Sequence, residues 1–247
     1  MRSAERVYRK LVAGGTRDFT AEYNLGVSLR EQDRLEEAVP HFRSAVELKP
    51  DFGDAHLDLG KTLWQLGRLE EAEQALRRAV SLKQPSETAW VALGGVLSGQ
   101  GNLEGAAGAL REGVRTAPAS PEAHYTLGLV LRRQGKIEEA AREMALAAAH
   151  RRERESTEAA IVATSGGIRC LEKGDFEGGV RYFTGAVSRA PQFAPAYYQL
   201  SLALRKLGRP EQAAAALHTA ETLDPGLRLS RSALGLRAWL QRQRSDR

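Results

Sequence analysis

The sequence predicts an all-α protein built from antiparallel helix pairs, and two periodic features carry that prediction. A leucine-glycine pair recurs every 34 residues, with its glycines at Gly26, Gly60, Gly94 and Gly128. In the second half of each period, a small residue is followed four positions later by a large one, such as Ala38 and then Phe42. A fixed period of about 20–50 residues indicates a stacked array in which each repeat buries its apolar face on its neighbours.

The glycine register continues through the chain with one irregular interval. After Gly128 the register resumes at Gly167, which is 39 residues on, and then at Ser201 and Gly235 in steps of 34. The five extra residues fall at 155–159, within a run that holds neither proline nor glycine. We therefore expect a helical insertion there, either as a longer second helix of the fourth repeat or as an earlier start to the fifth.

A turn is expected between the two helices of every repeat. Its central position holds a residue that tolerates a left-handed conformation, and a glutamate follows three residues later, where a helix dipole favours negative charge. The turn residues are Asp33, Gly67, Gly101, Gly135, Gly174 and Gly208, and the glutamates are Glu36, Glu70, Glu104, Glu138, Glu177 and Glu211. We interpret these glutamates as helix-start charges rather than catalytic acids.

These residues resemble the tetratricopeptide repeat (TPR) family, whose repeat also carries a proline near its end. Pro50, Pro118, Pro191 and Pro225 fit that position, whereas Arg152 occupies it in the fourth repeat. The resemblance implies a right-handed superhelical α-solenoid of stacked antiparallel helix pairs. The predicted parts are an N-terminal capping helix (half repeat) at 1–18, six repeats at 19–52, 53–86, 87–120, 121–154, 160–193 and 194–227, the insertion at 155–159, and a C-terminal capping helix with a basic tail at 228–247.

Composition narrows the classes of function. The net charge of +5 lies in residues 228–247, which hold six arginines against one aspartate, while the rest of the chain is neutral with 30 charges of each sign. No run of about 18 apolar residues predicts a membrane span, and the opening residues lack the apolar core of a secretory signal. We expect a cytoplasmic protein, and its single cysteine, Cys170, excludes an internal disulfide.

No constellation of residues predicts an enzyme. The five histidines show no close ligand spacing, and one cysteine cannot complete a multi-cysteine zinc site. The glycines at 99–105 do not fit a dinucleotide-binding fingerprint, because Glu104 occupies the position of its third glycine and no strand precedes them. We therefore expect no catalytic residues, no metal and no cofactor.

By resemblance to the family, the first helices of successive repeats line a concave groove. The expected groove residues combine an apolar and aromatic track with a cationic side. They are Tyr23, Arg30, Leu57, Lys61, Trp64, Val91, Tyr125, Arg132, Arg133, Tyr198, Arg205 and Lys206. We expect a protein–protein interaction scaffold that binds a partner segment carrying apolar and acidic residues, with Trp64, Tyr125 and Tyr198 as the main anchors.

Two alternatives stay open at this point. The chain could be a non-binding spacer or adaptor region of a larger protein, with these side chains as solvated surface. It could also bind RNA or an acidic surface through the arginine-rich tail, where phosphate contacts would make binding strongly dependent on salt.

Overall fold

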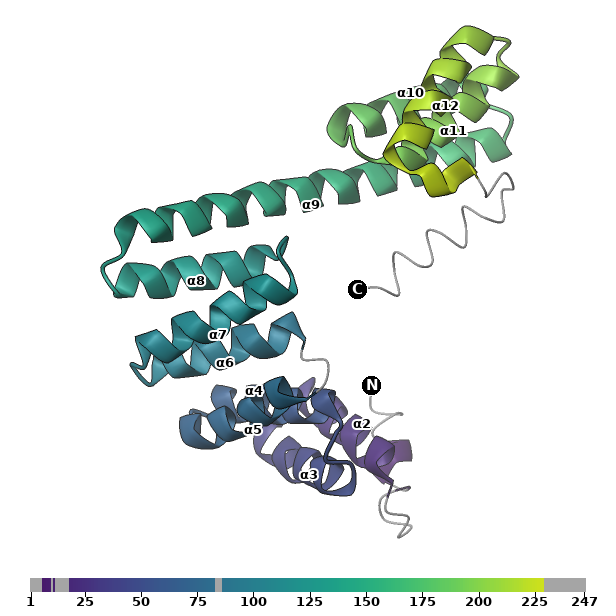
Figure 1. The fold of residues 1–247 in the computed structure, drawn as a ribbon. Coiled ribbons are helices and arrows are strands. Elements are labelled where there is room, and N and C mark those ends of the chain that lie inside the picture. The colour runs from purple at the N-terminus through teal and green to yellow at the C-terminus, as the bar shows by residue number, and fades with distance from the viewer. Residues whose placement is uncertain (1–5, 10, 12–17, 83–85, 229–247) are drawn as a thin grey trace. The chain divides into compact units, whose positions relative to one another are not determined.

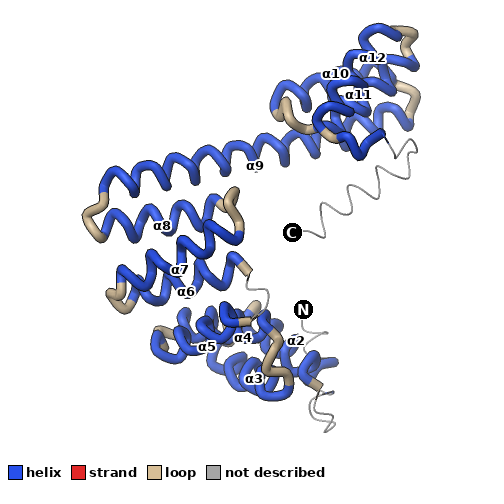
Figure 2. The backbone as a smooth tube through the Cα atoms, viewed as in Figure 1, coloured by secondary structure: helices blue, strands red, loops and turns tan. Residues whose placement is uncertain are grey.

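The computed structural model describes residues 6–9, 11, 18–82 and 86–228, and these residues form helices joined by short turns (Figures 1 and 2). No strand occurs among them, which confirms the predicted all-α class. The elements are α2 (Phe19–Arg30), α3 (Leu35–Leu48), α4 (Gly53–Gln65), α5 (Leu69–Ser81), α6 (Glu87–Gly99), α7 (Leu103–Thr116), α8 (Pro121–Arg133), α9 (Ile137–Glu172), α10 (Phe176–Arg189), α11 (Ala194–Lys206), α12 (Pro210–Leu223) and the short 3₁₀ helix η1 (Pro225–Arg228).

The chain divides into two compact units. The N-terminal unit comprises Met1–His150 and the C-terminal unit Arg151–Arg247, so the division falls within α9. None of the described helices combines the length and the apolar character that a membrane span requires.

Within the first five helix pairs, a glycine of the first helix lies directly against the large residue of the second. A Cβ added to Gly26 would lie 2.8 Å from Cε1 of Phe42, and one added to Gly60 would lie 2.5 Å from Cγ of Leu76. Both distances are below any normal carbon contact, so only glycine permits this approach of the two helices. The predicted role of the leucine-glycine register is confirmed.

The turns between paired helices have the predicted backbone. Asp33 has φ of 60°, and the five glycines expected at the same position, Gly67 to Gly208, have φ between 70° and 83°. The glutamate that follows each turn lies in the first turn of α3, α5, α7, α9, α10 or α12. The structure therefore accounts for all six glutamates as helix-start residues.

In the N-terminal unit, successive pairs share one continuous apolar core. Leu25, Leu59, Leu93 and Leu127 of the first helices are buried with Phe42 and other large residues of the second helices. Tyr8, in the helical residues 6–9, packs against this core. Most of the predicted N-terminal cap, and residues 229–247 of the predicted C-terminal cap, lie outside the described residues.

Helix α9 is the irregular element, with 36 residues in one continuous helix. It joins the second helix of the fourth predicted repeat to the first helix of the fifth, and residues 155–159 lie inside it. The family's terminal proline is replaced here by Arg152, and no glycine occurs between Ile137 and Ser165. With no residue that ends a helix, the two predicted helices merge into one.

In the C-terminal unit, α10 packs on α11 and α11 on α12. Phe183 of α10 is fully buried and lies against Gly167 of α9, where an added Cβ would be 2.4 Å from the ring. The fifth helix pair thus keeps the same internal contact as the first four, although its first helix belongs to α9.

Candidate functional site

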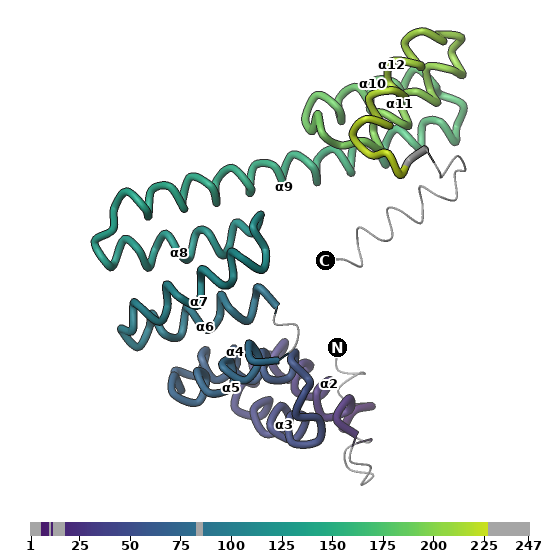
Figure 3. The backbone as a smooth tube through the Cα atoms, viewed as in Figure 1, coloured from purple at the N-terminus to yellow at the C-terminus, as the bar shows by residue number. Residues whose placement is uncertain are grey.

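The first helices of the N-terminal unit lie closer together than the second helices. α2 contacts α4, α4 contacts α6, and α6 contacts α8, whereas no contact of similar extent joins α3 to α5 or α5 to α7 among the described residues. The chain order of these helices can be followed in Figure 3. Because the stack is tighter on the side of the first helices, that side is the concave one in this unit.

Asp58 is the centre of a polar cluster on this side. The hydroxyl of Tyr23 donates a hydrogen bond of 2.9 Å to Oδ2 of Asp58, and Nη1 of Arg30 donates to Oδ1 at 2.5 Å. Burial, and next the negative charge of Asp58, raise the pKa of the Tyr23 hydroxyl above its ordinary value. The guanidinium of Arg30 also lies 5.7 Å from the ring centroid of Phe42.

Tyr23 and Arg30 therefore join α2 to α4 through Asp58, which the sequence reasoning did not pair with them. The signal that could have revealed this pair is an aspartate in α4 on the same face of the stack as the arginine of α2. Their polar groups are occupied within the protein, so these two predicted groove residues serve first as structural contacts.

Trp64 occupies the next junction, between α4 and α6. A Cβ added to Gly95 would lie 2.4 Å from Cη2 of the indole, so the ring rests directly against the backbone of α6. Trp64 is nevertheless 40% exposed. Gly95 was not predicted as a site residue, and its lack of a side chain is what allows the outer edge of the indole ring to approach α6 this closely.

The remaining predicted residues of the N-terminal unit differ in their exposure. Leu57 and Val91 are half-buried and pack against the core, and Lys61 is also half-buried. Tyr125 is 45% exposed, and Arg132 and Arg133 are exposed near the end of α8.

Arg133 is held against the neighbouring first helix. Its Nη1 donates to the backbone oxygen of Ser98 at 2.8 Å and to the Ser98 hydroxyl at 2.5 Å. Ser98 lies in the last turn of α6, where backbone carbonyls have no helical partner and the helix dipole favours a cation. Arg133 therefore fixes α8 to α6 with its charge still at the surface.

Three predicted residues, Tyr198, Arg205 and Lys206, lie in α11 of the C-terminal unit. Tyr198 is half-buried against a small cluster that includes Ala194 and Ala220, while Arg205 and Lys206 are exposed in the last turn of the helix. The structure thus distributes the predicted site over two units, with nine residues in the first and three in the second.

The buried histidines make structural contacts. Nε2 of His56 lies 3.0 Å from the backbone oxygen of Pro50, and Nε2 of His124 lies 2.9 Å from that of Pro118. Desolvation lowers the pKa of His56 below its ordinary value. No group of three or more histidine, cysteine, aspartate or glutamate side chains suited to a metal ion occurs in the part of the chain that the structure describes.

Comparisons with known proteins identify the repeat family over most of the chain. One tetratricopeptide repeat model matches residues 29–94, and a second matches residues 2–51, 91–160 and 167–228. No curated protein sequence shows a significant match.

Several solved structures have a similar fold. The Cut9-Hcn1 hetero-tetramer of the APC/C gives a TM-score of 0.53 at 16% identity, over 90% of this chain and 43% of that chain. PilF of Pseudomonas aeruginosa gives 0.50 at 20% identity, over 84% and 92%. YrrB, described as a TPR protein with an unusual peptide-binding site, gives 0.49 at 18% identity, over 88% and 92%.

The matched models together cover most of the chain, and both describe a tetratricopeptide repeat. Tetratricopeptide repeats form a non-catalytic scaffold for protein–protein interaction. The chain belongs to the tetratricopeptide repeat family.

Proposed function

We propose that the concave side of the N-terminal unit binds an extended or helical segment of a partner protein that carries apolar anchors and acidic residues. The observation that carries this proposal is Trp64, which is 40% exposed on the side of the first helices and rests on Gly95. A large aromatic side chain that stays at the surface while its position is fixed is a typical anchor of a protein interface.

The rigidity of this anchor favours binding. Because the indole already lies against the backbone of α6, little side-chain freedom remains to be lost when a partner covers it. Tyr125, on α8, adds a second exposed aromatic ring to the same side of the N-terminal unit. A partner segment with apolar side chains could cover both rings.

The charge of the surroundings selects for acidic residues in the partner. Lys61, Arg132 and Arg133 contribute cationic groups near the aromatic residues, and the Ser98 contacts hold Arg133 in place. Exposed charges of this kind mainly set the association rate and its dependence on salt. Arg30 contributes less, since Asp58 already compensates its charge.

Tyr198, Arg205 and Lys206 form a separate surface in the C-terminal unit, and we assign them a secondary role in the same function. A partner with two acidic segments could use both surfaces, and linkage would then raise the overall affinity.

The cytoplasmic location expected from the sequence stays a prediction. RNA or acidic-surface binding through the tail stays a prediction as well, because its arginines beyond Arg228 lie outside the described residues.

The test is a selection of peptides from a random display library on the whole chain, followed by affinity measurements with alanine variants. Trp64→Ala and Tyr125→Ala should each weaken the selected peptides by about tenfold or more, the effect of removing an interface anchor. Leu146→Ala is the matched control, because Leu146 is a similarly exposed large apolar residue (44%) in the second helix of the fourth repeat and belongs to neither proposed surface.

Unchanged affinity in both groove variants would contradict the proposal. Failure of any peptide to be enriched would favour the spacer or adaptor role instead. Selected peptides without acidic residues would leave the groove as the site but would refute the predicted charge of the partner.

A further inference from the structure

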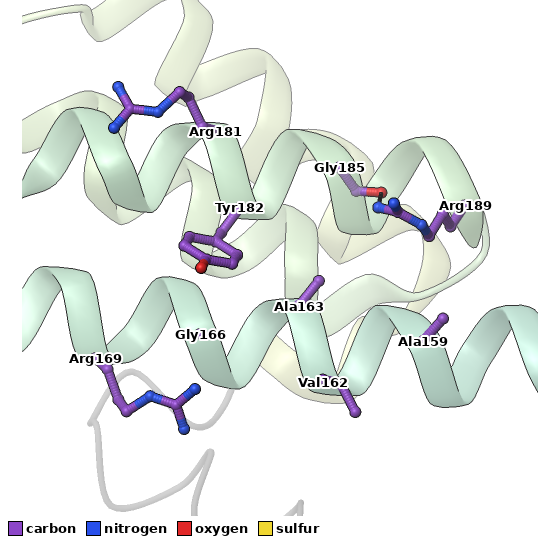
Figure 4. Close-up of a pocket in the computed structure, with 9 residues that line it drawn as sticks. All are labelled: Ala159, Val162, Ala163, Gly166, Arg169, Arg181, Tyr182, Gly185 and Arg189. Carbon is purple, nitrogen blue, oxygen red and sulfur yellow. Dashed lines mark hydrogen bonds between the residues drawn. The ribbon is translucent and has the colours of Figure 1, made fainter.

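A shallow hollow lies between α9 and α10 of the C-terminal unit, with a volume of about 900 Å³ (Figure 4). Its floor is made by the small residues Ala163, Gly166 and Gly185. Tyr182 reaches from α10 toward α9 over Gly166, where an added Cβ would lie 2.9 Å from the ring. The hollow shares no residue with the proposed binding groove, so it requires its own explanation.

The first observation is the third position of each repeat. In five repeats this position is a buried alanine, with exposed fractions of 0–3%: Ala21, Ala55, Ala89, Ala123 and Ala196. In the fifth repeat it is Val162, which is 71% exposed. The side chain at this position is therefore buried in the other five repeats and exposed to solvent in the fifth.

The tenth position shows the same contrast. It is small or apolar and at most 7% exposed in the other five repeats: Ser28, Thr62, Val96, Val130 and Ala203. In the fifth repeat it is Arg169, whose side chain is exposed. The face that carries the third and tenth positions is therefore charged and uncovered only on α9.

The helix contacts show which helix normally packs on the face that carries the third and tenth positions. α3 packs on α4, α5 on α6, α7 on α8, and α10 on α11, so the second helix of one repeat lies on the first helix of the next. The residues before Ala160 belong to the same continuous helix, and a helix without a turn cannot fold back on itself. The fifth repeat thus has the face that receives a helix, but the preceding part of α9 does not cover it.

The residues of this face are unsuited to an ordinary preceding repeat. Alanine at the third position allows close helix approach, and Val162 does not. A repeat helix packed over Arg169 would bury a charge, which is costly without a paired acidic group. The expected occupant is therefore a helix that brings its own negative charges.

Charge identifies the occupant more closely. Arg169, Arg181 and Arg189 line the hollow together with its apolar floor, and no acidic side chain among the described residues does so. Arg189 donates to the backbone oxygen of Gly185 at 3.1 Å, while Arg169 and Arg181 form no ion pair within the residues that the structure describes. Three cations around a non-polar floor attract an anionic, partly apolar ligand.

We propose that this face of α9 and α10 docks an acidic amphipathic helix of a partner protein. Its apolar side would cover Val162 and Tyr182, and its carboxylates would pair with the three arginines. A second copy of the same face would bring arginines against arginines. The chain's own residues 229–247 carry five arginines and one aspartate, so they too would meet like charge.

The test is a display library of amphipathic helices of about 20 residues, long enough to span a domain face, with the charged positions randomised. Selection uses the whole chain. Enriched helices should carry an excess of aspartate and glutamate. The variant Arg169→Glu/Arg181→Glu/Arg189→Glu should bind them at least about tenfold more weakly, because it reverses the charges that they pair with.

A charge-matched control separates this surface from the proposed groove. Arg132→Glu/Arg205→Glu/Lys206→Glu changes the same number of charges at sites outside the hollow and should retain the binding of the enriched helices. Trp64→Ala should also retain it, so failure of the groove proposal and failure of this one are distinguishable. Val162→Asp should weaken binding with little effect on folding, because the side chain is 71% exposed.

Three results would overturn the proposal. These are enrichment of no helix, enrichment without an acidic excess, and equal binding by the charge-reversed variant when circular dichroism shows that it is folded. A short single-stranded oligonucleotide is the competing probe. Its binding through the same arginines, with no acidic helix selected, would assign the face to nucleic acid instead.

Discussion

The α6–α7 pair and the pair formed by α10 with the second part of α9 have the same internal packing and different surroundings. Gly94 lies against Leu110 in one pair, and Gly167 lies against Phe183 in the other. Yet Val96 of α6 is fully buried, whereas Arg169 at the same repeat position is exposed. The conserved spacing of the repeat therefore determines how two helices pair, and other positions determine whether the pair is stacked.

Aspartate at the third repeat position should give the largest difference in stability between a stacked repeat and the fifth repeat. Ala123→Asp places a carboxylate at a fully buried site of α8 and should lower the free energy of unfolding by about 3 kcal/mol or more. Val162→Asp should change it by less than about 0.5 kcal/mol, since the side chain is already in solvent. Urea unfolding followed by circular dichroism measures both. Similar losses in the two variants would show that the fifth repeat is covered.

Leucine at a helix-pair glycine should have the next largest effect. Gly26→Leu forces the side chain into Phe42 and should cost about 1–3 kcal/mol through overpacking. Gly166→Leu is the comparison in the uncovered pair, where the added atoms meet Tyr182, a ring that is 49% exposed and can swing outward. We expect a smaller loss there. A thermal midpoint for Gly26→Leu equal to that of the unmodified protein would refute the close helix contact.

Two alanine substitutions in the glycine-rich third repeat should have the smallest effects, with opposite signs. Gly108 is exposed and has no atom within 4 Å of an added Cβ, so Gly108→Ala should stabilise the helix by up to about 1 kcal/mol. At Gly94 the added Cβ would lie 2.5 Å from Leu110, so Gly94→Ala should be destabilising. Thermal unfolding of both variants tests the difference, and a stabilising Gly94→Ala would contradict it.

The sequence alone predicted the features that repeat. The glycine contacts, the left-handed turn at Asp33 and the helix-start glutamates recur every period, so each copy supports the others. Helix α9 was harder to predict, because continuity across residues 155–159 depends on the absence of residues that end a helix rather than on a positive signal.

The site could be predicted only in outline. The repeat register placed Trp64 and Tyr125 among the first helices, but the pairing of Asp58 with Tyr23 and Arg30 depends on side-chain positions across two helices. The close contact between Gly95 and the Trp64 ring likewise depends on how α4 and α6 pack together. The face of α9 is uncovered for two reasons. The helix is continuous, and the third and tenth positions of the fifth repeat hold Val162 and Arg169.

Cysteine reactivity at the third repeat position tests most directly whether the fifth repeat is left uncovered. In a Cys170→Ser background, single cysteines replace Ala55, Ala89, Ala123, Val162 and Ala196 in turn, and a maleimide labels them under native conditions. Because the four alanines are at most 2% exposed, their cysteines should react only through local opening, about a hundredfold or more slower than Val162→Cys. Protection of Val162→Cys equal to that of the other four would contradict the account.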